Sequence, residues 1–358
     1  MDDQEAKQEA INPKQRREQA LRMCAPGTAL RTALDMIIAG HLGALITIGD
    51  EDAVIAAGTD GFKLDVSFTA SRLFELCKMD GAVVIDKDIT KILRANFHLN
   101  PDPTLPTAET GTRHRTAARM SLLTDAIVIS ISERRQVVNV YVDGKGSQLR
   151  PTPEVMSTAT QLTGIMQSTR EQLDRQLLRL STLELNNFVT LADVSSVIYL
   201  CEMLMTSAAE LDSCILELGR NGRVIDMQRQ EYAGTIDEEY TLLIRDYALD
   251  SSEANAAAIR EEFRKTPNDQ LRTPRNVARI LGYDDLNVDS IMTPLGLRTL
   301  NRVSVVRKGM ADKIIDEYGS LQDIVAAVDE DPAKLEEVGV NNPDVLADSL
   351  HRMWGRTS

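Results

Sequence analysis

A helix ends and a strand begins within residues 76–85, which read LCKMDGAVVI. Apolar positions up to Met79 have helical spacing, and Ala82–Ile85 is a short apolar run typical of a buried strand. Asp80 and Gly81 fall at the junction, where a carboxylate can be held at a sheet edge while backbone comes close to a ligand. An Asp-Gly pair alone is more often a simple turn. The stretch therefore predicts an α/β domain, with Asp80 as a candidate binding residue only if other residues support it.

The same alternation of helix and strand patterns extends in both directions, from Thr28 to Gln148. A helix is predicted around Leu30, Leu34, Ile37 and Ile38, and strands are predicted at residues 44–48, 54–57, 82–85, 126–131 and 137–142. A compact sheet with helices packed on it follows from this pattern.

After Pro151 nearly every segment has helical periodicity as far as Leu281, including an apolar stripe from Val194 to Ile215. Helix starts are predicted by a capping box at Thr235-x-x-Glu238 and by the pair Thr273-Pro274. Beyond Ser290 the chain reads as several short helices, interrupted at Gly309, Gly319, Asp331-Pro332 and Gly339. Three parts are expected, over residues 1–149 with a polar tail at 1–20, 150–289 and 290–358.

The bulk composition is that of a soluble globular protein, with 43% hydrophobic and 26% charged residues. A net charge of -14 argues against a surface that coats DNA or an anionic membrane as a whole, so any DNA contact must be local. We find neither a membrane-length apolar run nor a secretion signal, and expect a cytoplasmic protein that makes no membrane contact, with association with the nucleoid left open. The four scattered cysteines are expected to be reduced and mostly buried.

A second polar cluster, GTRHRT at residues 111–116, complements Asp80. Arginines and hydroxyls beside a glycine suit phosphate oxygens, and a carboxylate suits the divalent metal that accompanies nucleoside triphosphates. ATP is therefore a reasonable ligand, although such a run alone is usually a solvated loop. No phosphate loop of the G-x-x-x-x-G-K-[ST] type is present, because GKGS at residues 144–147 lacks the required spacing.

Several ordered blocks of the first domain resemble the diadenylate cyclase family. The blocks are Gly43–Ile46, Asp60–Phe62, Leu64-Asp65, Arg72-Leu73, Leu76–Ala82, Arg94–Asn96 and Gly111–Ala117. The whole chain resembles those members that add a helical spine and a helix-hairpin-helix-like module. The expected fold class is thus an α/β cyclase domain with a mixed sheet and flanking helices, then an all-α spine, then that C-terminal module.

The resemblance implies condensation of two ATP into cyclic di-AMP, with Mg²⁺ or Mn²⁺ bound by Asp80 and release of two pyrophosphates. The implied catalytic residues are Asp80, Arg113, His114 and Arg115. The implied ATP-binding residues are Gly81, Ala82, Leu99, Thr112, Arg113, His114, Arg115 and Thr116. A two-fold symmetric product fits two facing half-sites, so a monomer should be inactive, and the resemblance implies a homo-octamer. One departure from the family pattern is Ala118, where relatives often have an acidic residue.

The resemblance also implies that the C-terminal module binds branched DNA. The best candidate turn is Val338–Asn341, in which Asn341 replaces the second glycine. Basic residues cluster earlier, at Arg298, Arg302, Arg307, Lys308 and Lys313. Three alternatives remain open: a module that only packs or oligomerises, an inactive DNA-binding structural protein, and an adenylyltransferase with another acceptor.

Overall fold

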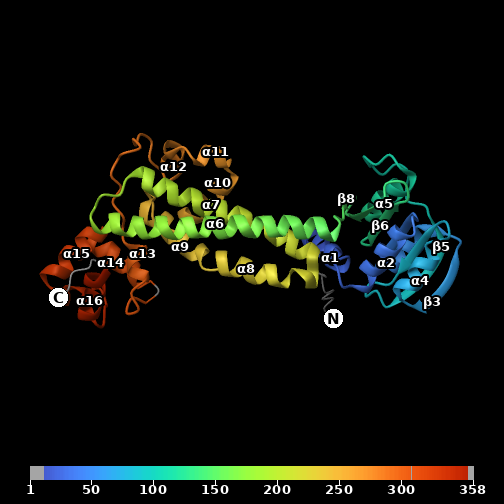
Figure 1. Ribbon diagram of the computed structural model, residues 1–358, viewed down its shortest axis with the longest axis horizontal. Helices are drawn as coiled ribbons and strands as arrows, with labels where there is room; N and C mark the ends of the chain where they lie inside the picture. The colour runs from blue at the N-terminus through green and yellow to red at the C-terminus, as the bar shows by residue number, and fades with distance from the viewer. Residues whose placement is uncertain (1–11, 308, 354–358) are drawn as a thin grey trace, which may run out of the picture. The chain divides into compact units, whose positions relative to one another are not determined.

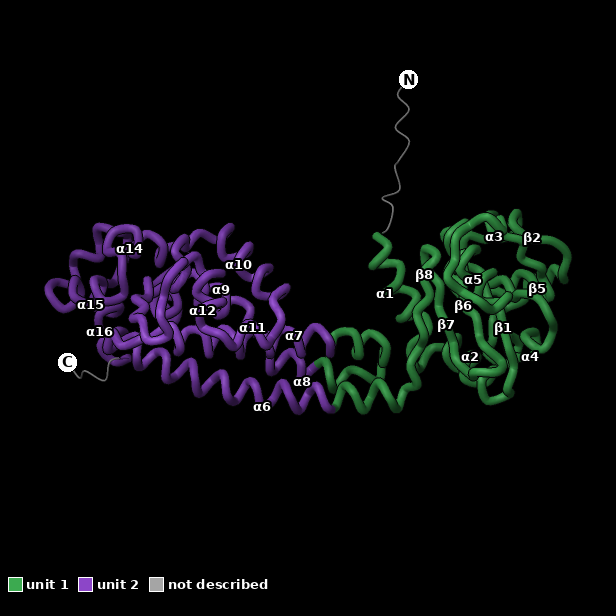
Figure 2. Tube along the Cα trace, turned by 90° about the horizontal axis from the view of Figure 1, so that it is seen from above, with its two compact units in different colours: residues 1–160, 212–226 green, residues 161–211, 227–358 purple. Residues whose placement is uncertain are grey.

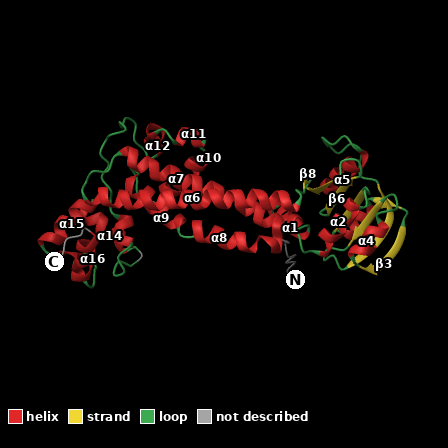
Figure 3. Ribbon diagram, in the orientation of Figure 1, coloured by secondary structure: helices red, strands yellow, loops and turns green. Residues whose placement is uncertain are grey.

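The computed structural model describes residues 12–307 and 309–353 (Figure 1). The chain divides into two compact units (Figure 2). The first unit comprises residues 1–160 and 212–226, and the second comprises residues 161–211 and 227–358. Within the described residues every named strand belongs to the first unit (Figure 3). The predicted succession of an α/β domain and a long helical region is confirmed.

The first unit is built on one mixed sheet with the strand order β2-β5-β4-β1-β6-β7-β8, in which β3 also pairs with β5. The strands are β1 (Ala44–Ile48), β2 (Gly58–Thr59), β3 (Phe62–Ser67), β4 (Ala82–Ile85), β5 (Lys91–Leu99), β6 (Ile127–Ser132), β7 (Val137–Val142) and β8 (Lys145–Gln148). Among the described strands only the central pair β1 and β4 runs parallel, and the other strand pairs are antiparallel. A strand buried on both faces reads as a continuous apolar run, and this explains the sequences of β1 and β4.

Helices cover both faces of this sheet. Alternate residues of β1 point to opposite cores: Ile46 packs with α1 (Pro13–Met23), α2 (Ala29–Ala39) and α4 (Ala70–Leu76). Leu45 packs instead with α3 (Glu51–Ala56) and α5 (Thr112–Leu123). The site elements β4, β5 and α5 therefore share the second of these cores.

Two local predictions in this unit are wrong. The apolar run at residues 54–57 was predicted as a strand, but it belongs to the helix α3 and its C-cap. The run at residues 111–116, which alone is typical of a loop, instead forms the N-cap and first turn of α5. Short apolar runs fit either type of element, and only the packing of Val54 into the core selects the helix here.

From residue 152 the described chain is almost entirely helical. Its helices are α6 (Thr152–Leu185), α7 (Leu191–Leu218), α8 (Arg223–Ala233), α9 (Ile236–Tyr247), α10 (Glu253–Lys265), α11 (Asn268–Leu271) and α12 (Pro274–Ile280), with a 3-10 turn, η1 (Gly219–Gly222). The apolar stripe of α7 is mostly buried within the chain itself, from Val194 to Leu211, and is not free to contact another subunit. Thr273 and Pro274 start α12 as expected, but the capping box is wrong because Thr235 makes no side-chain capping bond.

The C-terminal part is a set of short helices around its own apolar cluster. They are α13 (Leu297–Asn301), α14 (Met310–Tyr318), α15 (Leu321–Glu330), η2 (Pro332–Glu336) and α16 (Pro343–Met353). Gly309 and Gly319 flank α14, which confirms these breaks. In the candidate turn, Gly339 has φ +92°, whereas Asn341 is not among the residues with positive φ. The turn therefore has one left-handed residue, and its form is compatible with the expected hairpin module.

A buried charge cluster holds α13 against α6 and α9 within the second unit. The carboxylate of Asp246 accepts hydrogen bonds from the backbone N–H groups of Gly296, Leu297 and Arg298, at 2.6 to 3.0 Å. The Arg298 guanidinium pairs with Glu184 at 2.5 Å, and both side chains are at most 2% exposed. Arg298 is therefore inaccessible to DNA, and we withdraw it from the predicted DNA contacts.

The buried charge cluster predicts a pH-dependent stability of the second unit. Burial and the neighbouring Glu184 carboxylate raise the pKa of Asp246 to about 7, well above the ordinary value of an aspartate. Because the folded pKa is the higher one, this contribution to stability is fully present below about pH 4 and is lost as the pH rises through about 7. We expect Asp246→Asn to make the free energy of unfolding depend less on pH between about 4 and 7.

Urea unfolding of both proteins at the two ends of this pH range measures the effect. The same fall in stability with rising pH in the variant as in the unchanged protein would contradict the role of Asp246.

All four cysteines are buried and free, as the sequence predicts. One helical stretch among the described residues, Leu191–Tyr247, is long and apolar enough to cross a membrane by length and composition. Most of its apolar window is buried inside the structure, as in core helices of globular proteins that meet the same criteria.

Candidate active site

Asp80 is fixed through its backbone while its carboxylate stays exposed. The residue lies in the bend between α4 and β4. Its carbonyl oxygen accepts a hydrogen bond of 2.7 Å from the side-chain amide of Asn96 on β5. Among the described residues the Asp80 carboxylate has no hydrogen bond or ion pair, so it is available to a cation.

Gly81 is required by the close approach of β4 and β5. It has φ +88°, and a Cβ at this position would lie 2.8 Å from the carbonyl carbon of Asn96. Asn96 itself has φ +52°, at a register shift between the two strands. A bulge on one strand and a glycine on the other therefore set the direction in which Asp80 leaves the sheet.

The Arg113-His114-Arg115 run occupies the first turn of α5. Gly111 is the N-cap residue and supplies no side-chain bond to the helix. The first backbone N–H groups of a helix have no partner within it, and they carry a partial positive charge. Thr112 and Arg115 are exposed here, whereas Arg113, His114 and Thr116 are half-buried. The arrangement suits a phosphate group.

Arg113 connects this helix end to the segment before Asp80. Its guanidinium lies against Gly43, where a Cβ would be 2.1 Å from the arginine Nη1. Burial raises the pKa of the Cys77 thiol to about 12, and the nearby positive charge of Arg113 opposes this shift. The blocks that contain Gly43 and Arg113 thus meet in space, and Cys77 lies near enough for the charge of Arg113 to act on its thiol.

His114 is positioned by two residues that the sequence analysis missed. Its Nδ1 lies 2.9 Å from the hydroxyl of Tyr141 on β7. Burial and the neighbouring Glu109 carboxylate raise the pKa of Tyr141, which keeps its hydroxyl protonated. Gly146 leaves room for the ring, because a Cβ there would lie 2.6 Å from Tyr141 Cε1. No sequence motif links Tyr141 or Glu109 to His114, so only the structure reveals this set.

The remaining residues predicted for the ATP site differ in which of their atoms could contact a nucleotide. The Ala82 side chain is fully buried, so its only contact with a nucleotide would be through its backbone. Leu99 is partly buried against the same core cluster. Ala118, which departs from the family pattern, faces this core and is 2% exposed. The adjacent Arg119 holds the preceding loop through a hydrogen bond of 2.9 Å to the carbonyl of Leu105.

A shared metal fits this site better than a protein-enclosed one. Within the described ranges no group of three or more His, Cys, Asp or Glu side chains could hold a metal. Mg²⁺ commonly uses only one or two carboxylates together with substrate phosphates and water. The free, exposed carboxylate of Asp80 is consistent with that donor set.

Two family models match the chain. The model described as the nucleotide-binding region of the DisA bacterial checkpoint controller matches residues 31–146, and the model of its linker region matches residues 149–289. The DNA integrity scanning protein DisA of Corynebacterium glutamicum is 41% identical over 339 residues, which cover 93% of this chain and 92% of that protein. The protein of that name from Symbiobacterium thermophilum is 38% identical and covers 94% and 95%.

Proposed function

The chain belongs to the DisA family of bacterial checkpoint controllers, and from this premise we propose that it condenses two ATP molecules into cyclic di-AMP. The proposal includes release of two pyrophosphates and binding of branched DNA. The observation that carries it is the position of the Arg113 guanidinium, in the first turn of α5, against Gly43 and near Cys77 in the segment that leads to the exposed carboxylate of Asp80.

The proposed reaction consists of two equivalent displacements. The 3′-oxygen of one ATP forms a bond to the α-phosphorus of the other, the bond from that phosphorus to the pyrophosphate oxygen breaks, and the hydroxyl proton is released. The first turn of α5, with Thr112, Arg113 and Arg115, would orient the triphosphate and neutralise its charge. His114, held by Tyr141, would donate or accept a hydrogen bond at the nucleotide. Bound Mg²⁺ or Mn²⁺, with Asp80 as its protein ligand, would lower the repulsion between the phosphates and the attacking oxygen.

One chain supplies half of such a site. Because each ATP is both nucleophile and electrophile, two identical half-sites facing across a two-fold axis match the product. We propose facing subunits within a homo-octamer, and a chain kept monomeric should form no product.

Incubation of the purified protein with ATP and either Mg²⁺ or Mn²⁺ tests the function. We expect cyclic di-AMP, identified by mass. A product in which AMP is joined to another acceptor would instead favour an adenylyltransferase. No product from a folded oligomer with either metal would favour an inactive, DNA-binding structural protein.

Gly43→Ala is expected to slow product formation by roughly 10- to 100-fold while changing stability little. The added Cβ would displace the Arg113 guanidinium, which is the far end of a flexible side chain and can move without unfolding the sheet. Steady-state rates and urea unfolding measure both effects.

Gly164→Ala is the matched control for this substitution, because nothing lies within 4 Å of the added atom in α6. The control should keep its activity and gain about 0.5–1 kcal/mol of stability from the better helix former. Equal rates for the two alanine variants would contradict the role of Gly43 in placing Arg113.

The residues proposed to contact DNA are those of the C-terminal module that are exposed. Gly339 and Arg307 are exposed, and Arg302 is partly exposed but paired with Glu239 at 2.5 Å. Lys308 lies outside the described residues. Of the residues that the sequence predicts as DNA contacts, Arg307 and the Gly339 turn are therefore the best candidates for phosphate contacts.

DNA affinity should fall steeply with salt if the module contacts phosphates. We expect Arg307→Gln to lower the slope of log affinity against log salt concentration by about 1, for a branched substrate. Arg134→Gln, an exposed change in the first unit, is the control and should leave the slope unchanged. A salt-independent affinity would contradict phosphate contacts.

We also propose a cytoplasmic location. The support is the similarity to DNA integrity scanning proteins, together with the burial of most of the apolar helical stretch within the structure.

A further inference from the structure

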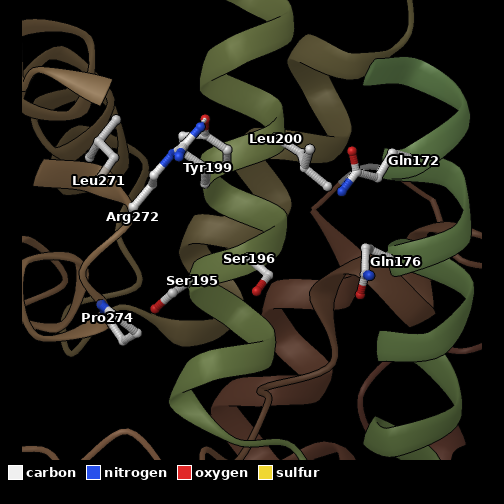
Figure 4. A pocket seen from close by; sticks show the side chains of 9 residues that line it. All are labelled: Gln172, Gln176, Ser195, Ser196, Tyr199, Leu200, Leu271, Arg272 and Pro274. Carbon is white, nitrogen blue, oxygen red and sulfur yellow. Dashed lines mark hydrogen bonds between the residues drawn. The ribbon is translucent and has the colours of Figure 1, made fainter. Parts of the chain in front are cut away.

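A polar groove in the second unit lies over the surface of α7. It encloses about 230 Å³ and contains none of the residues assigned to the ATP site. Its lining residues come from α6, α7 and the corner between α11 and α12: Gln172, Gln176, Ser195, Ser196, Tyr199, Leu200, Leu271, Arg272 and Pro274. Figure 4 shows the two glutamines on one side of α7 and the Leu271–Pro274 segment on the other. No acidic side chain lines it.

Arg272 places an unneutralised positive charge at this groove. Its Nε and Nη2 donate hydrogen bonds of 3.0 and 2.9 Å to the hydroxyl of Tyr199, and the guanidinium lies 5.3 Å from the centre of that ring. Within the described part of the chain it has no carboxylate partner. A guanidinium has five N–H donors, so several remain for a ligand while Tyr199 holds the group in place.

Neutral donors surround this charge. The side-chain amides of Gln172 and Gln176 form no hydrogen bond with any described residue. Ser195 is 4% exposed, and its hydroxyl has no hydrogen-bond partner among the residues that the structure describes. Figure 4 shows this hydroxyl directed toward Pro274, on the arginine side of the groove. A buried hydroxyl without a partner is costly, and a ligand oxygen that reached this wall would relieve the cost.

The rim strengthens the positive character of the groove. Arg175, one turn from Gln172 on α6, and Arg275 beside Pro274 are exposed and have no partner among the described residues. In a chain with a net charge of -14, a groove whose one charged lining side chain is an arginine is a local exception, although Glu171, Asp174 and Asp269 also flank its lining residues.

We propose that this groove binds a phosphate group. A fixed guanidinium, two amides and hydroxyls line one groove from α6, α7 and the corner between α11 and α12, and this set matches the several oxygens of a phosphate better than a single neutral acceptor. The volume suits one phosphate or a pyrophosphate, with the rest of a larger ligand projecting through the open side. The phosphate can come from a free anion or from a DNA phosphodiester. The site is independent of the proposed cyclase reaction.

Hydrogen–deuterium exchange of the full-length protein tests the proposal, because its local readout separates this groove from the ATP site. One arm uses inorganic pyrophosphate and the other a short DNA duplex. We expect slower exchange in peptides covering residues 189–201 and 266–280 with at least one probe. Protection by pyrophosphate identifies a free anion as sufficient, and protection by the duplex alone identifies phosphodiesters.

The variants are Arg272→Gln, which removes the charge, and Gln176→Glu, which adds a repelling one. Each should raise the probe concentration that gives half-maximal protection by about tenfold or more. Arg264→Gln is the control, since this exposed arginine of the same unit pairs with Glu261 and does not line the groove. No protection with either probe, or equal protection in Arg272→Gln and the control, would overturn the proposal.

Discussion

Replacement of Asp80 by asparagine is expected to reduce the rate of cyclic di-AMP formation by at least about 10³-fold. The change removes the negative charge that would share a divalent metal with the triphosphate, while side-chain volume is almost unchanged. The fold should persist, because the carboxylate has no partner among the described residues. The contact that fixes Asp80, its carbonyl oxygen bonded by Asn96, is a backbone contact that asparagine retains.

The matched control is Asp88→Asn, which removes the same charge from an exposed position after β4. Single-turnover rates with Mg²⁺ and with Mn²⁺, together with urea unfolding, separate a loss of chemistry from a loss of structure. We expect Asp88→Asn to match the unchanged protein in both measurements. A variant at Asp80 that keeps even a tenth of the rate with either metal would refute the metal role of this residue.

The strands that the sequence predicts well are those buried on both faces. β1 and β4 are continuous apolar runs, which only a covered strand tolerates. β5 was missed because it mixes buried and exposed residues and contains the left-handed Asn96. β3 was missed for a related reason, since its register shifts between Lys63 and Val66. Irregular strands do not follow the simple period of two on which the prediction depends.

The family blocks have a structural meaning that spacing alone does not give. Several contain residues with positive φ, such as Asp60, Asp65 and Asn96, or a glycine at a close approach, such as Gly43. Of these, Asn96 holds the carbonyl oxygen of Asp80, and Gly43 leaves room for the Arg113 guanidinium. The pairing of His114 with Tyr141 joins residues 27 positions apart on a helix and a strand, so no local pattern predicts it.

Arg298 is a residue that the sequence predicts to be exposed and that the structure shows to be buried. A cluster of basic residues predicts a cationic surface only if the side chains reach solvent. The Asp246 carboxylate accepts hydrogen bonds from the first backbone N–H groups of α13. This orients the Arg298 side chain inward, toward Glu184. Neighbouring Arg302 stays 47% exposed, although it has the same charge and lies on the same short segment.

This burial leads to the largest expected change in stability. Arg298→Met should lower the free energy of unfolding of the second unit by about 3–5 kcal/mol, because Glu184 would remain buried without its positive partner. Tyr247 also donates to Glu184, at 2.7 Å, but a neutral hydroxyl does not replace the lost charge. Urea unfolding followed by helical circular dichroism measures the loss, because the second unit contains most of the long helices.

Arg302→Gln and a double variant decide whether the effect arises from an unpaired buried charge. Arg302→Gln removes a partly exposed pair with Glu239 and should cost no more than about 1 kcal/mol. Adding Glu184→Gln to Arg298→Met should recover part of the loss, since the buried carboxylate is then neutral and the two sites are coupled. If the double variant is less stable than Arg298→Met alone, the cost comes from lost packing. If Arg298→Met is as mild as Arg302→Gln, the charge cluster does not hold α13 in place.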